Sequence, residues 1–216
     1  MLTKREEADL AAIKQYSSRV LADDLTGHAA DHVLRVVRLA QRIAATERCR
    51  LFIVLAGAYL HDVLDDKLVA DEQAARANLT DFLQSLDLSE AVIRHILLVI
   101  DNVSFSKEMV QGKKSELTIE CQIVQDADRI DALGAIGILR TAYYGGSKGH
   151  AIFEKGQPDQ AITSKEDYRK PGGVINHFYV KLIKIYDRLN TTEAKRIGKA
   201  RHDFLLTFLE QFHSEW

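Results

Sequence analysis

Long proline-free stretches with a helical spacing of apolar residues dominate this sequence. Among 216 residues, proline occurs only at positions 158 and 171, and proline is the residue that most strongly breaks a helix interior. In residues 32–44, HVLRVVRLAQRIA, apolar side chains recur three and four residues apart, which indicates an amphipathic helix. No segment shows the sustained alternation of a strand, so we predict an all-α fold. The same spacing predicts helices over residues 5–22, 51–64, 70–86, 89–102, 117–143, 175–189 and 192–214.

Size and charge narrow the class of protein. A chain of 216 residues can bury one good-sized core, so we predict one domain over residues 1–216, a single multi-helix globule. The net charge of −2 argues against a dedicated nucleic-acid binder. No apolar run approaches the ~18 residues that a membrane span needs, and the charged N-terminal segment MLTKREEADL does not look like a secretory signal. We therefore expect a cytoplasmic protein without a membrane partner, and the sequence leaves open whether it forms a homodimer.

Residues 145–173 interrupt the helical pattern. This segment holds both prolines and six of the twelve glycines, and it is rich in basic side chains, including Lys148 and Lys155. Long irregular segments in compact proteins often form lids or binding loops. We expect a mobile loop that contacts an anionic substrate, while a loop that is simply solvated remains the alternative.

The stretch AYLHDVLDDKL, residues 58–68, places ionisable groups at the end of an apolar helix. The apolar stripe of that helix continues into Asp62, and His61 lies at its edge. A buried carboxylate is costly unless something compensates its charge, and a divalent metal ion does so efficiently. A structural ion pair at the helix end is the competing interpretation.

Two other predicted helices also carry ionisable side chains on or beside their apolar stripes. His32 lies at the edge of one apolar stripe, and Asp126 lies among the apolar positions of another. Two imidazoles and two carboxylates neutralise one divalent ion, and their mixed nitrogen and oxygen atoms suit manganese, iron, cobalt, nickel or zinc. For Asp126, a helix cap or a salt bridge with Arg129 or Arg140 remains open. Asp131 is expected to be a structural acid that pairs with a neighbouring helix.

The ordered set of histidine, histidine-aspartate and aspartate resembles the HD-domain superfamily of metal-dependent phosphohydrolases. The similar segments are DHVLRVVRLA, AYLHDVLDDK, VQDADRIDALGAIGILRTAYYGG and the C-terminal part that begins NHFYVKLIKIYDRLN. The resemblance covers most of the chain and is nearest to small bacterial HD hydrolases. It implies one divalent metal ion, manganese first and iron, cobalt, nickel, zinc or magnesium otherwise, bound by His32, His61, Asp62 and Asp126.

The resemblance also implies a reaction and roles for further residues. It suggests a nucleotide substrate, with a nucleoside triphosphate cleaved to monophosphate and pyrophosphate. A nucleoside monophosphate phosphatase, a di-iron oxygenase and a non-catalytic metal- or nucleotide-binding regulatory domain are the alternatives. Related sequences carry an acid pair after the histidine-aspartate pair, so Asp65 and Asp66, with Lys67, are the expected catalytic residues. The expected substrate-binding residues are His28, Lys148, Lys155, His177 and Lys181.

Overall fold

A computed structural model describes residues 1–22, 30–65, 69, 71–104, 108, 116–154 and 173–216. These residues form helices and contain no strand, which confirms the predicted all-α class. The chain divides into two compact units, Met1–Ser104 with Glu116–Gln125 and Phe105–Ser115 with Asp126–Trp216. That the whole chain is one domain stays a prediction. No helix in the described part of the chain combines the length and the apolar character that crossing a membrane requires.

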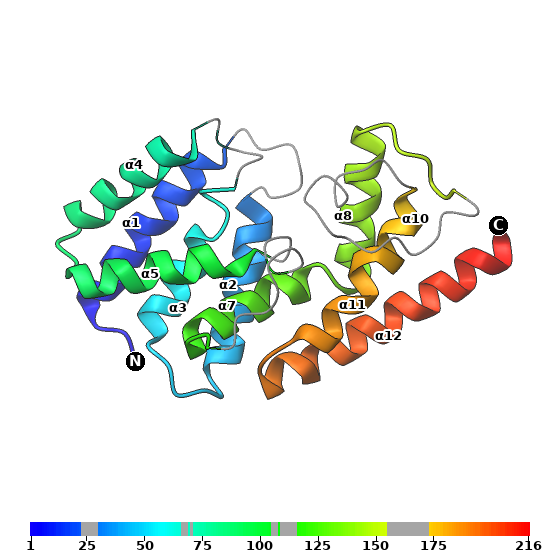
Figure 1. The fold of residues 1–216 in the computed structure, drawn as a ribbon. Coiled ribbons are helices and arrows are strands. Elements are labelled where there is room, and N and C mark those ends of the chain that lie inside the picture. The colour runs from blue at the N-terminus through cyan, green and yellow to red at the C-terminus, as the bar shows by residue number, and fades with distance from the viewer. Residues whose placement is uncertain (23–29, 66–68, 70, 105–107, 109–115, 155–172) are drawn as a thin grey trace. The chain divides into compact units, whose positions relative to one another are not determined.

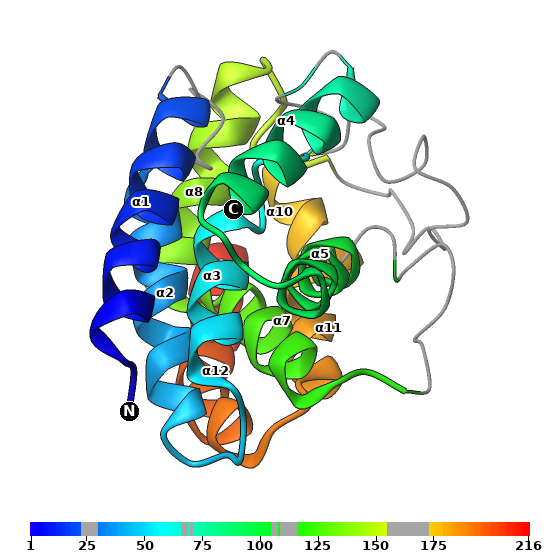
Figure 2. The ribbon, with the colours of Figure 1, turned by 90° about the vertical axis from the view of Figure 1, so that its left-hand side faces the viewer.

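The first unit is built around one short, fully apolar helix. Its complete helices are α1 (Lys4–Val20), α2 (Ala30–Ala44), α3 (Leu51–Leu60), α4 (Glu72–Ser85) and α5 (Glu90–Val103). Helix α3 packs against α1, α2 and α5, and Figure 2 shows it between them. Every residue from Phe52 to Ala58 is buried. A helix that is apolar on all faces has no side for water, and this is why α3 forms the core.

Two details fix the position of α3. Its N-cap residue, Arg50, makes no capping bond with its own side chain; instead, its backbone N–H donates to a carboxylate oxygen of Glu120 at 2.9 Å. Glu120 belongs to α7 (Ile119–Asp131), which begins in this unit. In the middle of α3, Gly57 lies against α5 so closely that an added Cβ would come 2.6 Å from Cγ1 of Val99. Glycine is therefore required for this approach of α3 to α5.

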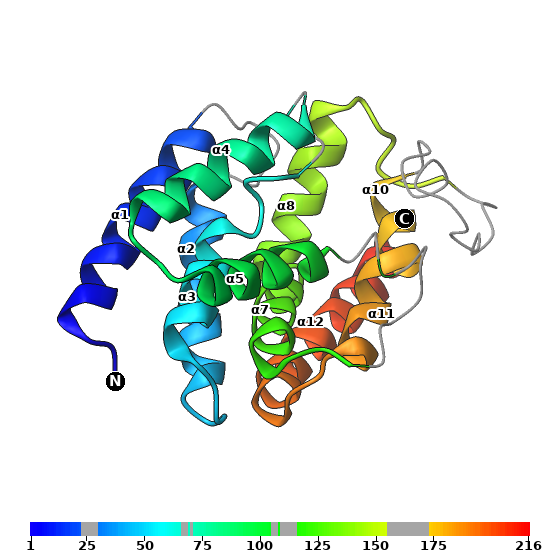
Figure 3. The ribbon, with the colours of Figure 1, turned by 60° about the vertical axis from the view of Figure 1, so that its left-hand side comes forward.

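The second unit contains the C-terminal helices, which Figures 1 and 3 show in order along the chain. They are α8 (Gly134–Ser147), α10 (Val174–His177), a π-helical turn (Phe178–Leu182), α11 (Ile183–Ile185), a 3-10 turn (Tyr186–Arg188) and α12 (Thr192–Glu215). Helix α12 packs against α8 and α11. The buried side chains of this core are Leu133, Ile175, Phe178, Leu182, Ile185, Leu205 and Leu209.

Three predicted helices need correction. The helix predicted over 117–143 is two helices, because Leu133 is extended and Gly134 adopts a φ of 73°, a conformation that favours glycine. The helix predicted over 51–64 ends at Leu60 and continues as a turn. The segment 175–189 is helical, but part of it is π-helical and 3-10. In addition, the segment predicted as a loop from residue 145 begins later, because α8 extends to Ser147.

Candidate metal centre

The turn after α3 carries the histidine-aspartate pair. His61 is the C-cap of α3, and the turn is closed by backbone bonds from Val63 to Leu60 at 3.2 Å and from Asp65 to Asp62 at 3.0 Å. The carbonyl end of a helix carries partial negative charge, which favours a cation. Because the apolar helix α3 is buried, the turn at its C-terminal end, with the side chains of His61 and Asp62, is held at a fixed position.

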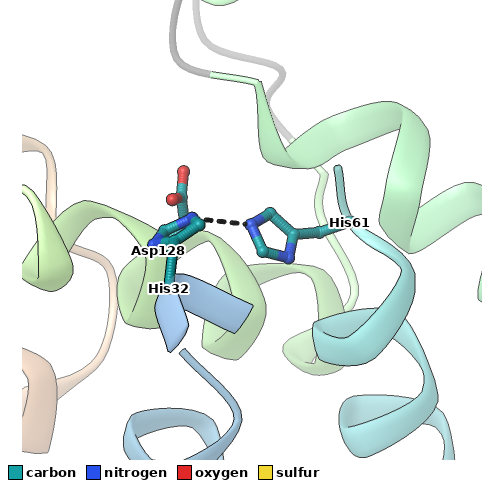
Figure 4. A group of neighbouring side chains, drawn as sticks. All are labelled: His32, His61 and Asp128. Atoms are coloured by element: carbon teal, nitrogen blue, oxygen red, sulfur yellow. Dashed lines mark hydrogen bonds between the residues drawn. The ribbon is translucent and has the colours of Figure 1, made fainter. Parts of the chain in front are cut away.

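Three side chains of the first unit converge there. Nε2 of His32, from the first turn of α2, lies 3.2 Å from Nε2 of His61. One carboxylate oxygen of Asp62 lies 3.4 Å from the His32 nitrogen and 3.3 Å from the His61 nitrogen. Figure 4 shows the two imidazoles with these nitrogens facing each other. All three residues are buried, and His32 is 0% exposed. The structure thus brings His32, His61 and Asp62 together, as the sequence predicts.

One hydrogen bond sets the tautomer of His61. Its Nδ1 lies 2.9 Å from the carbonyl oxygen of Ala58, one turn earlier in α3. A carbonyl oxygen only accepts, so Nδ1 carries the proton and donates it. In a neutral imidazole, Nε2 then presents its lone pair toward His32 and Asp62. Metal-binding histidines commonly donate their other N–H in this way, which fixes both the ring and the tautomer.

The spacing of the three atoms fits a metal ion. Ligands about 2.1 Å from an ion lie about 3.0 Å apart in an octahedron and about 3.4 Å apart in a tetrahedron. The three edges measured between His32, His61 and Asp62 are 3.2, 3.4 and 3.3 Å, within this range. Two nitrogens and one carboxylate oxygen also make a donor set that transition metals accept. The cluster can therefore hold a divalent metal ion.

Asp126, the fourth predicted ligand, is hydrogen-bonded through both carboxylate oxygens to the chain before α12. One of its carboxylate oxygens accepts from the backbone and side-chain N–H groups of Asn190, at 2.8 and 2.9 Å. The other accepts from the backbone N–H and the hydroxyl of Thr191, at 2.7 and 2.8 Å. Burial raises the pKa of the Asp126 carboxyl, and these hydrogen bonds act in the opposite direction. Four donors from Asn190 and Thr191 thus occupy the acceptor positions of this carboxylate.

A neighbouring acid, Asp128, lies close to the two imidazoles. One of its carboxylate oxygens and one ring nitrogen each of His32 and His61 lie within 4.8 Å of one another (Figure 4). A sequence signal for Asp128 exists, because it follows Cys121 by seven residues and Val124 by four. Both of those residues are fully buried, so all three share one face of α7.

The remaining predicted site residues are placed only in part. Asp65 is half-buried and follows Asp62 in the same turn. His177 ends α10, and Lys181 lies in the π-helical turn; both are half-buried and belong to the second unit. Exposed Lys148 follows α8, with its ammonium group 5.8 Å from the ring centroid of Tyr144. The predicted residues outside the described part of the chain are His28, Asp66, Lys67 and Lys155.

The described ends of the basic segment 145–173 are held side by side within the second unit. The backbone N–H groups of Val174 and Ile175 donate to the carbonyls of Ala151 and Ile152, at 2.8 and 2.9 Å. The Asn176 side chain also accepts from the backbone N–H of Glu154 at 3.1 Å and donates to its carbonyl at 3.3 Å. The described residues 151–154 and 174–176 therefore lie side by side.

The chain is similar to known proteins along most of its length. The family described as HD domain matches residues 29–133. A solved protein from Lactobacillus plantarum is 40% identical, with a TM-score of 0.88 and coverage of 100% of this chain and 99% of that one. A solved HD-superfamily hydrolase from Bacillus thuringiensis is 35% identical, with a TM-score of 0.76 and coverage of 98% of each chain.

A third relative is YpgQ from Bacillus subtilis. It is 32% identical over 203 residues, which cover 94% of this chain and 91% of YpgQ. Its structure in complex with ADP matches with a TM-score of 0.78 over 98% of this chain and 97% of YpgQ. The buried histidine-aspartate cluster and these similarities along the whole chain lead to the same conclusion: the chain belongs to the HD superfamily of hydrolases.

Proposed function

We propose that this chain is a metal-dependent phosphohydrolase that cleaves a nucleoside triphosphate to a monophosphate and pyrophosphate. The observation that carries the proposal is the triangle of donor atoms from His32, His61 and Asp62, whose edges of 3.2 to 3.4 Å suit one divalent ion. Its similarity to an HD-superfamily hydrolase supports hydrolysis. The ADP bound by YpgQ supports a nucleotide as substrate.

The proposed ligands are His32, His61, Asp62 and Asp128, with Asp128 replacing Asp126. Two carboxylates balance the charge of a divalent cation, and manganese is the ion that we expect first. When bound, such a cation activates a water molecule and withdraws charge from a phosphoryl oxygen. His61 keeps its nitrogen lone pair directed at the site through its bond to Ala58, at 2.9 Å.

Asp65 is the proposed general base. It follows Asp62 in a turn closed by a backbone bond of 3.0 Å, so the two carboxylates are carried by the same short piece of backbone. Asp65 is half-buried, and a carboxylate at such a position can orient a water molecule and accept its proton. We propose that this proton transfer accompanies attack of the water oxygen on phosphorus. Asp66 is proposed to support Asp65.

Cations outside the metal site must offset the charge of the triphosphate and of the leaving pyrophosphate. The proposed groups are Lys67, Lys148, Lys155, Lys181, His28 and His177. Of these, Lys148, Lys181 and His177 lie in the described part of the second unit, and Lys67, Lys155 and His28 lie outside the described residues.

A screen of nucleotides with manganese tests this function. Triphosphates, diphosphates and monophosphates are each incubated with the protein, and orthophosphate and pyrophosphate are detected separately. We expect turnover of triphosphates with pyrophosphate as the first inorganic product. Turnover confined to monophosphates would instead support a nucleotidase, and metal binding without turnover of any nucleotide would support a regulatory domain.

A further inference from the structure

The α7 turn that carries Asp128 lies close to the end of its helix. Helix α7 ends at Asp131, three residues after Asp128, and the chain is already extended at Leu133. The carbonyls of Arg129 and Ile130 still accept the backbone N–H groups of Ala132 and Leu133, at 3.2 and 3.1 Å, but the regular helical bonding ends there. Side chains that anchor the residues directly around Asp128 to other structure would therefore help to hold its carboxylate in place.

Asp126 anchors the turn on the N-terminal side of Asp128. Its carboxylate receives four hydrogen bonds of 2.7 to 2.9 Å from Asn190 and Thr191. Thr191 is the N-cap of α12 and accepts from the backbone N–H of Ala194 at 3.3 Å. The acid therefore ties α7 to the point where the long C-terminal helix begins, and it is 0% exposed.

Arg129 anchors the turn on the C-terminal side of Asp128. One guanidinium nitrogen donates to the carbonyl oxygen of Arg188 at 2.7 Å, and another pairs with the Glu108 carboxylate. Arg188 also pairs with Glu108, at 3.1 Å. The side chains of Arg129 and Glu108 are 1% and 6% exposed, so both members of this pair are buried. A buried charge pair of this kind is directional and strongly resists separation.

Both anchors reach the same short piece of chain. Asp126 binds residues 190 and 191, and Arg129 binds residue 188. We propose that Asp126, Arg129 and Glu108 are positioning residues that hold Asp128 at the metal centre by fixing its turn to residues 188–191. The inference rests on the proposed function, because it takes Asp128 as a metal ligand. The sequence alone did not give Asp126 or Arg129 this positioning role.

The matched control is a second ion pair that involves α7. Asp131, which is 1% exposed, accepts from Arg140 of α8 at 2.9 Å, as the sequence predicted for a structural acid. This pair ties α7 to α8 and does not involve residues 188–191. Breaking it removes an ion pair of the same unit, with a buried acid and a partner that is 22% exposed, three residues beyond Asp128, and leaves the bonds of Asp126 and Arg129 in place.

The test is the affinity for Mn²⁺, measured by electron paramagnetic resonance on metal-free protein, together with the thermal unfolding temperature. We expect Asp128→Ala to lose the ion. Arg129→Met and Asp126→Asn should bind it about 10- to 100-fold more weakly, as is usual for residues that orient a ligand. Asp131→Asn should unfold at a lower temperature and keep the affinity of the wild type. If Arg129→Met does not fold, Asn190→Ala replaces it, since this variant removes a single bond to Asp126.

The outcomes separate this inference from the proposed function. Wild-type protein that binds no Mn²⁺ would overturn both. Wild-type protein that binds Mn²⁺ while Arg129→Met, or Asn190→Ala in its place, binds it equally tightly would overturn the positioning role alone. Weakened binding in Asp131→Asn, in proportion to its lost stability, would also overturn it, because general loosening of α7 would then explain the effect. A complete loss of the ion in Asp126→Asn, with Asp128→Ala unaffected, would return the ligand role to Asp126.

Discussion

A methyl group at Gly57 should disturb the metal centre without touching it. The added Cβ would lie 2.6 Å from Cγ1 and 3.2 Å from Cβ of Val99 on α5. Carbon atoms in contact prefer about 3.5 to 4.0 Å, so the two helices must separate by about 1 Å unless Val99 gives way. Valine in a helix has essentially one side-chain rotamer, so Val99 cannot easily turn aside.

The size of the effect follows from this overlap. Inserting a methyl group into a well-packed core destabilises a protein by about 1–3 kcal/mol. His61 lies four residues after Gly57, one turn along the same face of α3. A displacement of about 1 Å at a catalytic site lowers the rate by about 10²-fold. Gly57→Ala should therefore reduce both the free energy of unfolding and kcat/KM.

Three variants, measured by urea unfolding and by pyrophosphate release, test whether the contact between Gly57 and Val99 controls stability and activity. Val99→Ala added to Gly57→Ala should recover part of both quantities, because it removes the Cγ1 atom nearest to the new methyl group. Gly146→Ala is the control, since an added Cβ there meets no other atom within 4 Å. Wild-type stability and activity in Gly57→Ala, or no recovery in the double variant, would refute the argument.

Three further predictions concern the site and the break after α7. Asp62→Ala should lose the bound ion and nearly all turnover, because its carboxylate oxygen lies 3.3 and 3.4 Å from the two imidazoles; elemental analysis showing one ion per chain with normal turnover would contradict this. Asp65→Asn should retain the ion in the same analysis but lose about 10²–10⁴-fold in kcat, because an amide accepts no proton; a wild-type kcat would make Asp65 structural. Gly134→Ala should lower the free energy of unfolding by about 1–2 kcal/mol, since its φ is 73° and a Cβ would crowd Arg201 at 3.2 Å; an unchanged urea midpoint would count against it.

The convergence of His32, His61 and Asp62 could be predicted from the sequence. A run of ten apolar residues, 51–60, ends directly before His61 and Asp62, and polar groups so placed must lie at the edge of a core. The periodicity around His32 gave the second histidine in the same way. Both inferences needed only the helical repeat and the cost of burying charge.

The choice between Asp126 and Asp128 could not be made with the same certainty. The two acids are two residues apart on α7, so they point in different directions, and apolar residues precede both at helical spacing. What separates them is the partner of Asp126, the chain before α12, which lies 64 and 65 residues further along. Contacts between residues so far apart in the sequence depend on the tertiary fold, and they cannot be predicted from the helical repeat.

The break between α7 and α8 was missed for a similar reason. Gly134 and Gly137 stand in an otherwise helical pattern, and an isolated glycine in such a pattern does not by itself end a helix. In the structure, a Cβ at Gly137 would lie 2.1 Å from the carbonyl oxygen of Ala132, because the chain folds back at the break. Gly137 therefore fits a bend of the chain that depends on the packing of the second unit and that the helical repeat does not predict.

Phosphorus NMR of one reaction mixture tests the central claim most directly. A nucleoside triphosphate is incubated with the Mn²⁺-loaded protein, and parallel samples contain either the Asp62→Ala variant or wild-type protein treated with chelator. We predict that monophosphate and pyrophosphate appear in equal amounts with the wild-type protein alone, and that neither parallel sample forms them. Orthophosphate as the first product, or equal product formation after removal of the metal, would contradict a metal-dependent pyrophosphohydrolase at the cluster of His32, His61 and Asp62.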